Sequence, residues 1–223
     1  MKNYNLLDIL YKHRFNEKEI IQKNKIWKIL CRYFLNKHIT KNDIVLDAGT
    51  GFGEFINNIC CKEKYAVDAN EENAKFLALG IKFFKSRHNN FSFLMNNSVD
   101  VIFMSNFSEH LLTKNDLLHM ILEARRILRP EGRLIILGPN IRYAYKEYWD
   151  FFDHHIPLSH RAMAEVLEAL NFKITKLIPR FLPYTTKSNF PKSSFFVWLY
   201  LKFPFLWLLA GKQMFIVAVK QGN

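Results

Sequence analysis

A loop with three glycines lies between two acidic residues in the first third of the chain. It reads Asp47-Ala48-Gly49-Thr50-Gly51-Phe52-Gly53 and follows a short apolar run, and Asp68 stands 19 residues beyond Gly49. Glycines let a backbone turn tightly and approach a ligand without Cβ clashes. A carboxylate at the end of the next strand can accept hydrogen bonds from both ribose hydroxyls of an adenosine. Together these residues predict a site for an adenosine-containing cofactor.

Glu54 separates two classes of cofactor that use this ribose contact. A dinucleotide loop has a third glycine at this position, where the following helix packs closely and a pyrophosphate binds. Glu54 would place a negative charge beside the phosphates, so nicotinamide and flavin dinucleotides are disfavoured. Asp47 suits a ligand with an amine, and the glycines suit an amino-acid moiety above the loop. We expect a helix to begin near Glu54; a tight turn without a ligand is the alternative.

Several motifs resemble those of class I S-adenosylmethionine-dependent methyltransferases. VLDAGTGFGEF is similar to their motif I, and YAVDAN to the acidic end of their second strand. DVIFMSNFSEHL is similar to their strand-four motif, and LRPEGRLIILGPN to the helix and strand that follow it. The segments YWDFFDHHIPLSH, RFLPYTTKSNFP and GKQMFIVAVK resemble the type 11/23 methyltransferases found with bacterial surface-glycan and lipid biosynthesis enzymes.

This resemblance implies S-adenosyl-L-methionine as the methyl donor. Asp47 and the glycines would border its methionine part, and Asp68 would bind its ribose. The chain departs from the family after the third strand, where Phe84-Lys85-Ser86-Arg87 offers no carboxylate to the adenine amine, and Ser86 is a candidate for that contact. Ser105 and Asn106 would form the floor beneath the sulfonium. The full set implied to bind the cofactor is Asp47, Ala48, Gly49, Thr50, Gly51, Phe52, Gly53, Asp68, Ala69, Ser105 and Asn106.

The residues after the fourth expected strand disfavour several methyl acceptors. Amino methylation of DNA bases usually needs a Pro-Pro-aromatic motif, but 105–108 contains no proline, and Cys31, Cys60 and Cys61 are not placed for cytosine C5 methylation. Arginine methylation needs paired glutamates, and only Glu109 is present. We therefore favour in-line O-methylation of a glycan, lipid-linked sugar or small-molecule hydroxyl. A nucleic-acid methyltransferase and a noncatalytic S-adenosylmethionine-binding protein remain alternatives.

Three histidines are the predicted catalytic residues. His110 follows the fourth strand on the side from which an acceptor would approach, and an imidazole can take a hydroxyl proton near neutral pH. The alternative is that Glu109-His110 caps or orients the next loop. His154 or His155 is predicted to line the acceptor site, in a cluster with Asp153 and His160. Because adjacent histidines point apart in an extended chain, no metal site is predicted.

Strands and helices alternate along the chain to position these residues. Apolar runs predict strands over 44–46, 65–67, 81–84, 99–104, 134–137, 173–178 and 214–219. Helical spacing predicts helices over 17–37 and 117–128, the second ended by Pro130-Glu131-Gly132. A further helix near Ser159 follows a polar, aromatic loop over 140–155. With the resemblance, this order predicts an α/β, Rossmann-like three-layer class I methyltransferase sheet of seven strands, the last antiparallel.

A single domain accounts for the 223 residues. We expect an N-terminal helical segment over 1–40, a methyltransferase core over 41–181 and 213–223, and an aromatic lid or insertion over 182–212. The run FFVWLYLKFPFLWLL within the insertion is too short to span a bilayer and contains Lys202 and Pro204. It forms either a lid or a membrane-interface segment, the latter with these residues at headgroup level: Trp198, Tyr200, Trp207, Lys192, Lys202 and Lys212.

Charge and cysteine usage restrict the partners and the compartment. The formal net charge of +12 favours anionic surfaces, although solvated helix faces would also account for many of the lysines. The N-terminal stretch lacks the apolar core of a secretory signal, and the three scattered cysteines predict no disulfide. We expect a cytoplasmic protein with a small-molecule, glycan or lipid-linked acceptor and without nucleic acid. Binding of the insertion to an anionic membrane would place it at the inner face.

Overall fold

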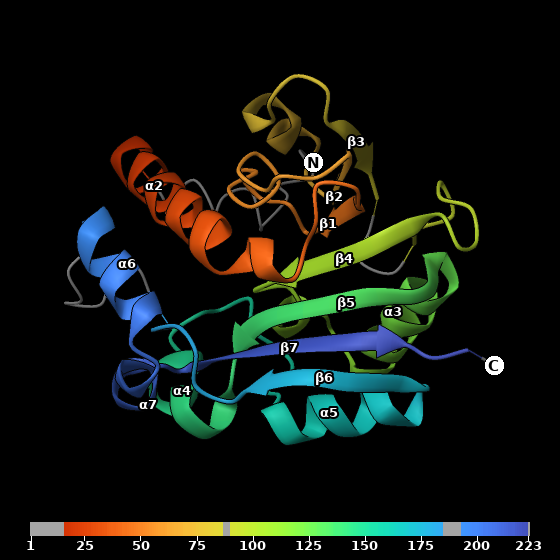
Figure 1. The fold of residues 1–223 in the computed structure, drawn as a ribbon. Helices are drawn as coiled ribbons and strands as arrows, with labels where there is room; N and C mark the ends of the chain where they lie inside the picture. Colours follow the sequence, from red (N-terminus) through yellow and green to blue (C-terminus); the bar gives the residue numbers. More distant parts are fainter. Residues whose placement is uncertain (1–15, 87–89, 185–192, 223) are drawn as a thin grey trace, which may run out of the picture.

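The computed structural model describes residues 16–86, 90–184 and 193–222. A seven-stranded sheet runs through it in the order β3-β2-β1-β4-β5-β7-β6 (Figure 1). Neighbouring strands are parallel except at β7, which is antiparallel to β5 and to β6. The predicted class I sheet is therefore confirmed. Its strands are β1 (Ile44–Ala48), β2 (Glu63–Asp68), β3 (Lys82–Lys85), β4 (Val99–Ser105), β5 (Leu128–Pro139), β6 (Phe172–Ile178) and β7 (Gln213–Lys220).

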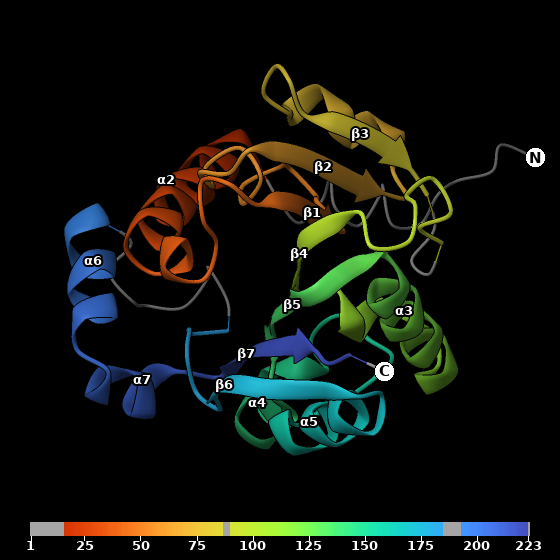
Figure 2. The same ribbon diagram turned by 45° about the vertical axis from the view of Figure 1, so that its right-hand side comes forward.

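Helices cover both faces of this sheet (Figures 1 and 2). The helix α2 (Glu17–Tyr33) lies on one side, and α3 (Lys114–Ile127) and α5 (His160–Ala169) lie on the other. Further helices are α4 (Ile141–Tyr148), α6 (Ser194–Lys202) and α7 (Phe205–Ala210), with 3-10 turns at η1 (Leu35–Lys37), η2 (Glu71–Phe76) and η3 (Ser108–His110).

Each central strand contributes to two separate hydrophobic cores. On β1, Leu46 belongs to the core beneath α3 and α5, whereas its neighbour Val45 belongs to the core beneath α2. Successive side chains of a strand point to opposite faces, so a sheet that is covered on both sides needs uninterrupted apolar runs. This requirement explains why such short apolar runs sufficed to predict the strands.

Local capping explains where the predicted helices begin. Asn16 and Glu19 form a reciprocal capping box at the start of α2, and Thr113 and Asp116 form another at the start of α3. The Ser159 side chain accepts from the backbone of the first turn of α5. These side chains satisfy N–H groups that have no partner within the helix. The helix predicted over 17–37 ends earlier, at Tyr33, and continues as η1.

The prediction of a helix beginning near Glu54 is wrong, because residues 54–58 form turns. The Asn57 side chain donates to Phe76 O (2.9 Å) and accepts from Ala78 N (2.9 Å), which ties this turn to the segment around η2. Asparagine side chains that bond to distant backbone compete with helix formation.

The loop predicted over 140–155 also needs correction, because its first half is the helix α4. Asn140 caps this helix by accepting from Arg142 N (3.3 Å). The residues of α4 are mostly aromatic and charged, so they show no clear helical spacing of apolar side chains. The helix carries the chain across the end of the sheet and brings residues 153–154 back to η3.

The helix α6, which belongs to the predicted insertion, packs beside α2 (Figures 1 and 2). The Tyr200 hydroxyl donates to Phe181 O (2.6 Å), and Trp207 Nε1 donates to Tyr200 O (2.8 Å). Within the described ranges, no helix has the length and apolar character needed to cross a membrane. Expectations that concern residues 1–15, Arg87 and Lys192 lie outside the described residues.

Candidate active site

The glycine loop turns sharply at the end of β1. Gly49, Gly51 and Gly53 all have positive φ, at 75°, 53° and 73°. A Cβ on Gly49 would lie 2.5 Å from the Phe107 ring, and one on Gly53 would lie 2.7 Å from Leu77, so close packing requires both glycines. A Cβ on Gly51 would meet no protein atom nearer than 4.0 Å. Gly51 therefore borders open space at the loop, where a ligand can approach the backbone.

Asp68 joins the end of β2 to this loop. Its Oδ2 accepts from Gly51 N (2.9 Å), and its Oδ1 accepts from Asn70 N (2.9 Å). Each carboxylate oxygen has a second lone pair, so these backbone bonds orient the group while leaving it able to accept from a ligand hydroxyl. The half-buried side chain thus has the chemistry that the predicted ribose contact requires.

Asp47 is buried beneath the loop, with 3% of its surface exposed. Burial raises the pKa of its carboxyl to about 8, partly opposed by the Thr50 hydroxyl, which donates to Asp47 Oδ2 (2.8 Å); the charges of Glu54 and Asp68 raise the pKa further. The carboxyl is therefore mostly protonated at pH 7. A nearby ammonium group would favour the charged form and lower this pKa.

We expect cofactor binding to release a proton from Asp47. At pH 7, S-adenosylmethionine should displace roughly one proton, and its affinity should rise up to about tenfold between pH 6 and 7, because the proton that binding releases leaves more readily as the pH rises. Calorimetry in buffers of different ionisation enthalpy measures this release. Asp47→Asn should abolish it, whereas Asp100→Asn at the opposite end of the sheet should retain it. Absence of release in the unaltered protein would contradict the ammonium contact.

Ser105 and Asn106 lie where β4 ends beside β1. Asn106 has φ 47°, and its backbone N–H donates to Leu137 O (2.8 Å). Phe107 follows directly and packs on Gly49, so the strand-four motif and the glycine loop are in contact. The predicted floor residues are thus placed at the carboxyl edge of the sheet next to the loop. The Ser86 hydroxyl donates to Asn90 O (2.7 Å), and its contact with adenine remains a prediction.

His110 forms a pair with Asp153. Its Nδ1 lies 3.2 Å from Asp153 Oδ2 and 3.0 Å from the Asp153 carbonyl oxygen. Because both partners are acceptors, Nδ1 carries the proton, and Nε2 is the nitrogen that can bind another group. Burial lowers the pKa of His110, but the hydrogen bond that its ring donates to Asp153 and the charge of Glu109 outweigh burial and raise the pKa overall.

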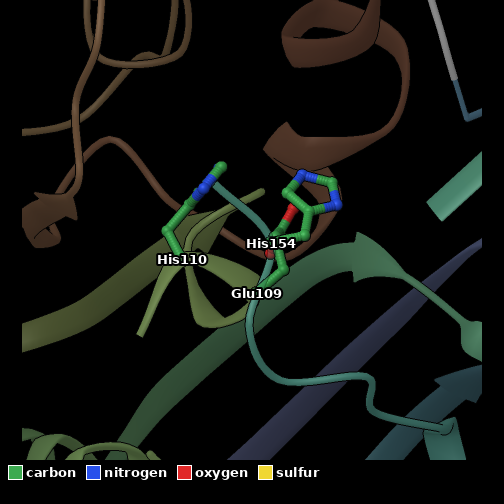
Figure 3. Close-up of side chains that lie close together, drawn as sticks. All are labelled: Glu109, His110 and His154. Atoms are coloured by element: carbon green, nitrogen blue, oxygen red, sulfur yellow. The ribbon is translucent and has the colours of Figure 1, made fainter. Parts of the chain in front are cut away.

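His154 lies beside His110, with ring centroids 5.0 Å apart. Its Nδ1 is 2.9 Å from Tyr148 O and 3.2 Å from the Tyr184 hydroxyl. The carbonyl acceptor again places the proton on Nδ1. Figure 3 shows His154 approaching Glu109 and His110, which come from η3.

Glu109 completes this cluster, with 2% of its surface exposed. Burial raises the pKa of its carboxyl to about 7, opposed mainly by the charge of His110. Its Oε2 is buried and has no hydrogen-bond partner within the described residues. A nitrogen from each histidine and a carboxylate oxygen of Glu109 all lie within 4.8 Å of one another. Three groups that can accept a proton therefore converge on one space.

Comparison with known proteins identifies the domain that contains most of this site, and His154 lies beyond the matched residues. Residues 46–136 match the methyltransferase domain family of type 11, and this span holds the glycine loop, Asp68 and His110. The chain carries a class I methyltransferase domain. Its methyl donor is S-adenosylmethionine. None of the curated proteins matches the chain in sequence.

Solved structures of methyltransferases share the fold. A SAM-dependent methyltransferase from Archaeoglobus fulgidus is 22% identical, with a TM-score of 0.67 over 98% of this chain and 100% of its own. One from Methanosarcina mazei is 16% identical, with a TM-score of 0.63 over 85% and 97%. One from Thermotoga maritima is 19% identical, with a TM-score of 0.62 over 93% and 97%.

The methyltransferase brings only some of the predicted catalytic histidines together. His110 and His154 meet, but the side chain of His155 is exposed, and only its backbone N–H reaches Glu109 O (2.7 Å). His160 lies apart, with its Nδ1 2.8 Å from the Asn140 amide. Glu109 as a site residue and Asp153 as the partner of His110 were not predicted from the sequence. The adjacent Glu109 and His110, directly after a buried strand, were the sequence feature that could have indicated Glu109 as a site residue.

Proposed function

We propose that this methyltransferase methylates a hydroxyl group of a glycan, a lipid-linked sugar or another small molecule. The main support is the buried cluster of Glu109, His110 and His154, which follows the predicted sulfonium floor at Ser105 and Asn106. A neutral hydroxyl must lose its proton as its oxygen accepts a methyl group. An enclosed group of imidazole and carboxylate side chains is suited to receive that proton.

The reaction needs alignment and one proton transfer. Bound S-adenosylmethionine supplies a methyl group whose bond to sulfur breaks as the bond to the acceptor oxygen forms, leaving a neutral thioether. The glycine loop and Asp68 orient the donor. The side chains of the Glu109, His110 and His154 cluster hold the acceptor oxygen in line with the bond between sulfur and the methyl group. His110 Nε2 accepts the hydroxyl proton, because Asp153 engages Nδ1 and holds the ring in place.

The proposal is tested by offering the purified protein a panel of acceptors with S-adenosylmethionine. Sugars, polyprenyl-linked sugars and small alcohols represent hydroxyl acceptors, and amines, RNA and DNA represent the alternatives. Release of S-adenosylhomocysteine and the mass of the product are measured. We expect transfer to hydroxyl acceptors. Transfer confined to amines or nucleic acid would refute the hydroxyl assignment, and tight donor binding without turnover would favour a noncatalytic role.

We also propose that the acceptor is reached at an anionic membrane surface. Six large apolar side chains of α6, α7 and their junction are between 45% and 74% exposed, namely Phe195, Phe196, Phe203, Phe205, Leu208 and Leu209. Exposed Lys202 lies among them. The neighbouring helix α2 carries exposed Lys25, Lys28 and Arg32 at helical spacing. Apolar side chains flanked by basic ones are typical of segments that bind the interface of anionic bilayers.

Flotation with phosphatidylglycerol-containing vesicles checks this membrane contact. We expect Leu208→Ser with Leu209→Ser to weaken partitioning by about 100-fold, because each leucine that enters the bilayer contributes roughly 1.5 kcal/mol. The control is Leu79→Ser with Leu112→Ser, which removes two other largely exposed leucines. The proposal fails if the unaltered protein does not float, or if the control pair weakens binding equally.

A further inference from the structure

We propose that Glu109, His110 and His154 bind one divalent first-row transition cation. The three side chains come from η3 and from the segment after α4 (Figure 3). Two imidazoles and one carboxylate form a donor set that such cations prefer. This proposal adds a resident ion to the cluster. With the ion bound, His110 is a ligand, and the ion takes over the activation of the hydroxyl that the proposed function assigns to His110, so the role of the ion in the reaction rests on that function.

The spacing of the donors suits a single ion. One ligand atom from each residue lies within 4.8 Å of the others. Donors that each sit about 2.1 Å from one ion are about 3.4 Å apart when the angle between them is tetrahedral. The widest pair must therefore close by about 1.4 Å, which side-chain rotations can supply.

The surrounding hydrogen bonds prepare both histidines as ligands. Asp153 holds His110 through Nδ1, and the carbonyl of Tyr148 holds His154 through Nδ1. A histidine that binds a metal usually donates its other N–H to a carboxylate or to a backbone carbonyl, which fixes the ring and its tautomer. The structure contains one example of each, and both bonds engage Nδ1 of the ring.

Glu109 provides an independent indication that the cluster binds a cation. Its Oε2 has no hydrogen-bond partner among the described residues, and a buried carboxylate oxygen in that state is costly because it has lost water and gained no hydrogen bond in return. The Tyr148 hydroxyl is likewise buried without such a partner in the described part of the chain, and the charge of Glu109 acts on it. A bound cation would satisfy the carboxylate directly.

The donor set indicates the class of ion and its use. Nitrogen ligands favour manganese, iron, cobalt or zinc over magnesium or calcium, which bind mainly oxygen. Three protein ligands leave coordination positions open, as in catalytic rather than structural sites. An acceptor hydroxyl placed in an open position would become more acidic, and its proton would then pass to solvent.

Cobalt(II) and manganese(II) titration of the full chain tests the site directly. We expect one ion per chain, visible as cobalt d–d absorption and as loss of the free manganese EPR signal. Glu109→Gln and His154→Ala should each weaken binding at least tenfold. His155→Ala is the matched control, because it removes the adjacent, exposed histidine outside the cluster. Circular dichroism of each variant confirms that it is folded.

The outcomes for the ion and for the reaction are separable. The metal site is refuted if the unaltered protein binds no stoichiometric ion, or if His155→Ala weakens binding as much as His154→Ala. Methyl transfer to hydroxyls by chelator-treated protein at the full rate would refute the role of the ion while leaving the proposed function standing. Specific metal binding without transfer to any hydroxyl would support the site and refute the proposed function.

Discussion

Asp68→Ala is expected to weaken S-adenosylmethionine binding at least 100-fold. Its carboxylate is oriented by Gly51 N and Asn70 N, and we expect it to accept from two ribose hydroxyls. Hydrogen bonds to a charged group contribute about 1.5–3 kcal/mol each, so the loss of two corresponds to at least about 3 kcal/mol. Isothermal titration calorimetry measures the affinity, and the cofactor-induced rise in Tm gives an independent reading.

Asp100→Ala is the matched control for this prediction. Asp100 Oδ2 also accepts from a backbone N–H, that of Ile44 (2.8 Å), and its carboxylate pairs with Arg129 near the start of β4. This variant should lose stability but keep its affinity for the cofactor. Equal loss of affinity in both variants would indicate that Asp68 acts only through folding.

A pair of glycine variants separates ligand contact from backbone strain. Gly51 and Gly80 both have positive φ, and an added Cβ would meet little protein at either position. Alanine should therefore impose similar strain at both, but only Gly51→Ala should also weaken cofactor binding. Unchanged affinity in Gly51→Ala would argue against close approach of the cofactor to the loop.

His110→Ala is expected to slow single-turnover methyl transfer about 100- to 10,000-fold, the range typical for loss of a positioned proton acceptor. Affinity for S-adenosylmethionine should stay within about twofold, because His110 belongs to the acceptor side of the site. Rapid-quench measurement of methylated product, with the donor saturating, checks this rate. A bound ion at the cluster would lead to the same loss, since His110 would then be one of its ligands.

Two further variants make the result specific to this position. His119→Ala removes an exposed histidine on α3 and should leave the rate unchanged. Asp153→Asn should lower kcat about tenfold with little change in KM, because Asp153 positions His110 and does not touch the acceptor. Full activity of His110→Ala would refute its role and leave Glu109-His110 as a local cap.

The contact between the glycine loop and Asp68 could be predicted from sequence because both follow strands that are neighbours. The glycine loop and Asp68 follow two strands that are consecutive in the chain and adjacent in the sheet, as β1 and β2. The carboxyl ends of parallel neighbouring strands lie at one edge, so their next residues must meet. Apolar runs located every strand because both faces of the sheet are buried.

The errors arose where long-range contacts override local preference. The helix expected at Glu54 is replaced by turns, because Asn57 bonds to backbone more than 18 residues away. The helix α4 was not predicted, because its face toward the sheet carries only two buried residues, Ala144 and Tyr148. Neither outcome follows from the composition of the segment alone.

The sequence by itself determined where the strands lie along the chain, and it placed the glycine loop and Asp68 at the ends of neighbouring strands. Only the tertiary structure decided which histidines meet, because Asp153 and His110 are 43 residues apart and are joined through α4. It also decided that His154 is buried and His155 exposed, and that Glu109 Oε2 is enclosed without a hydrogen-bond partner among the described residues. Burial and the direction of a side chain depend on what packs around it, and that information is not carried by neighbouring residues.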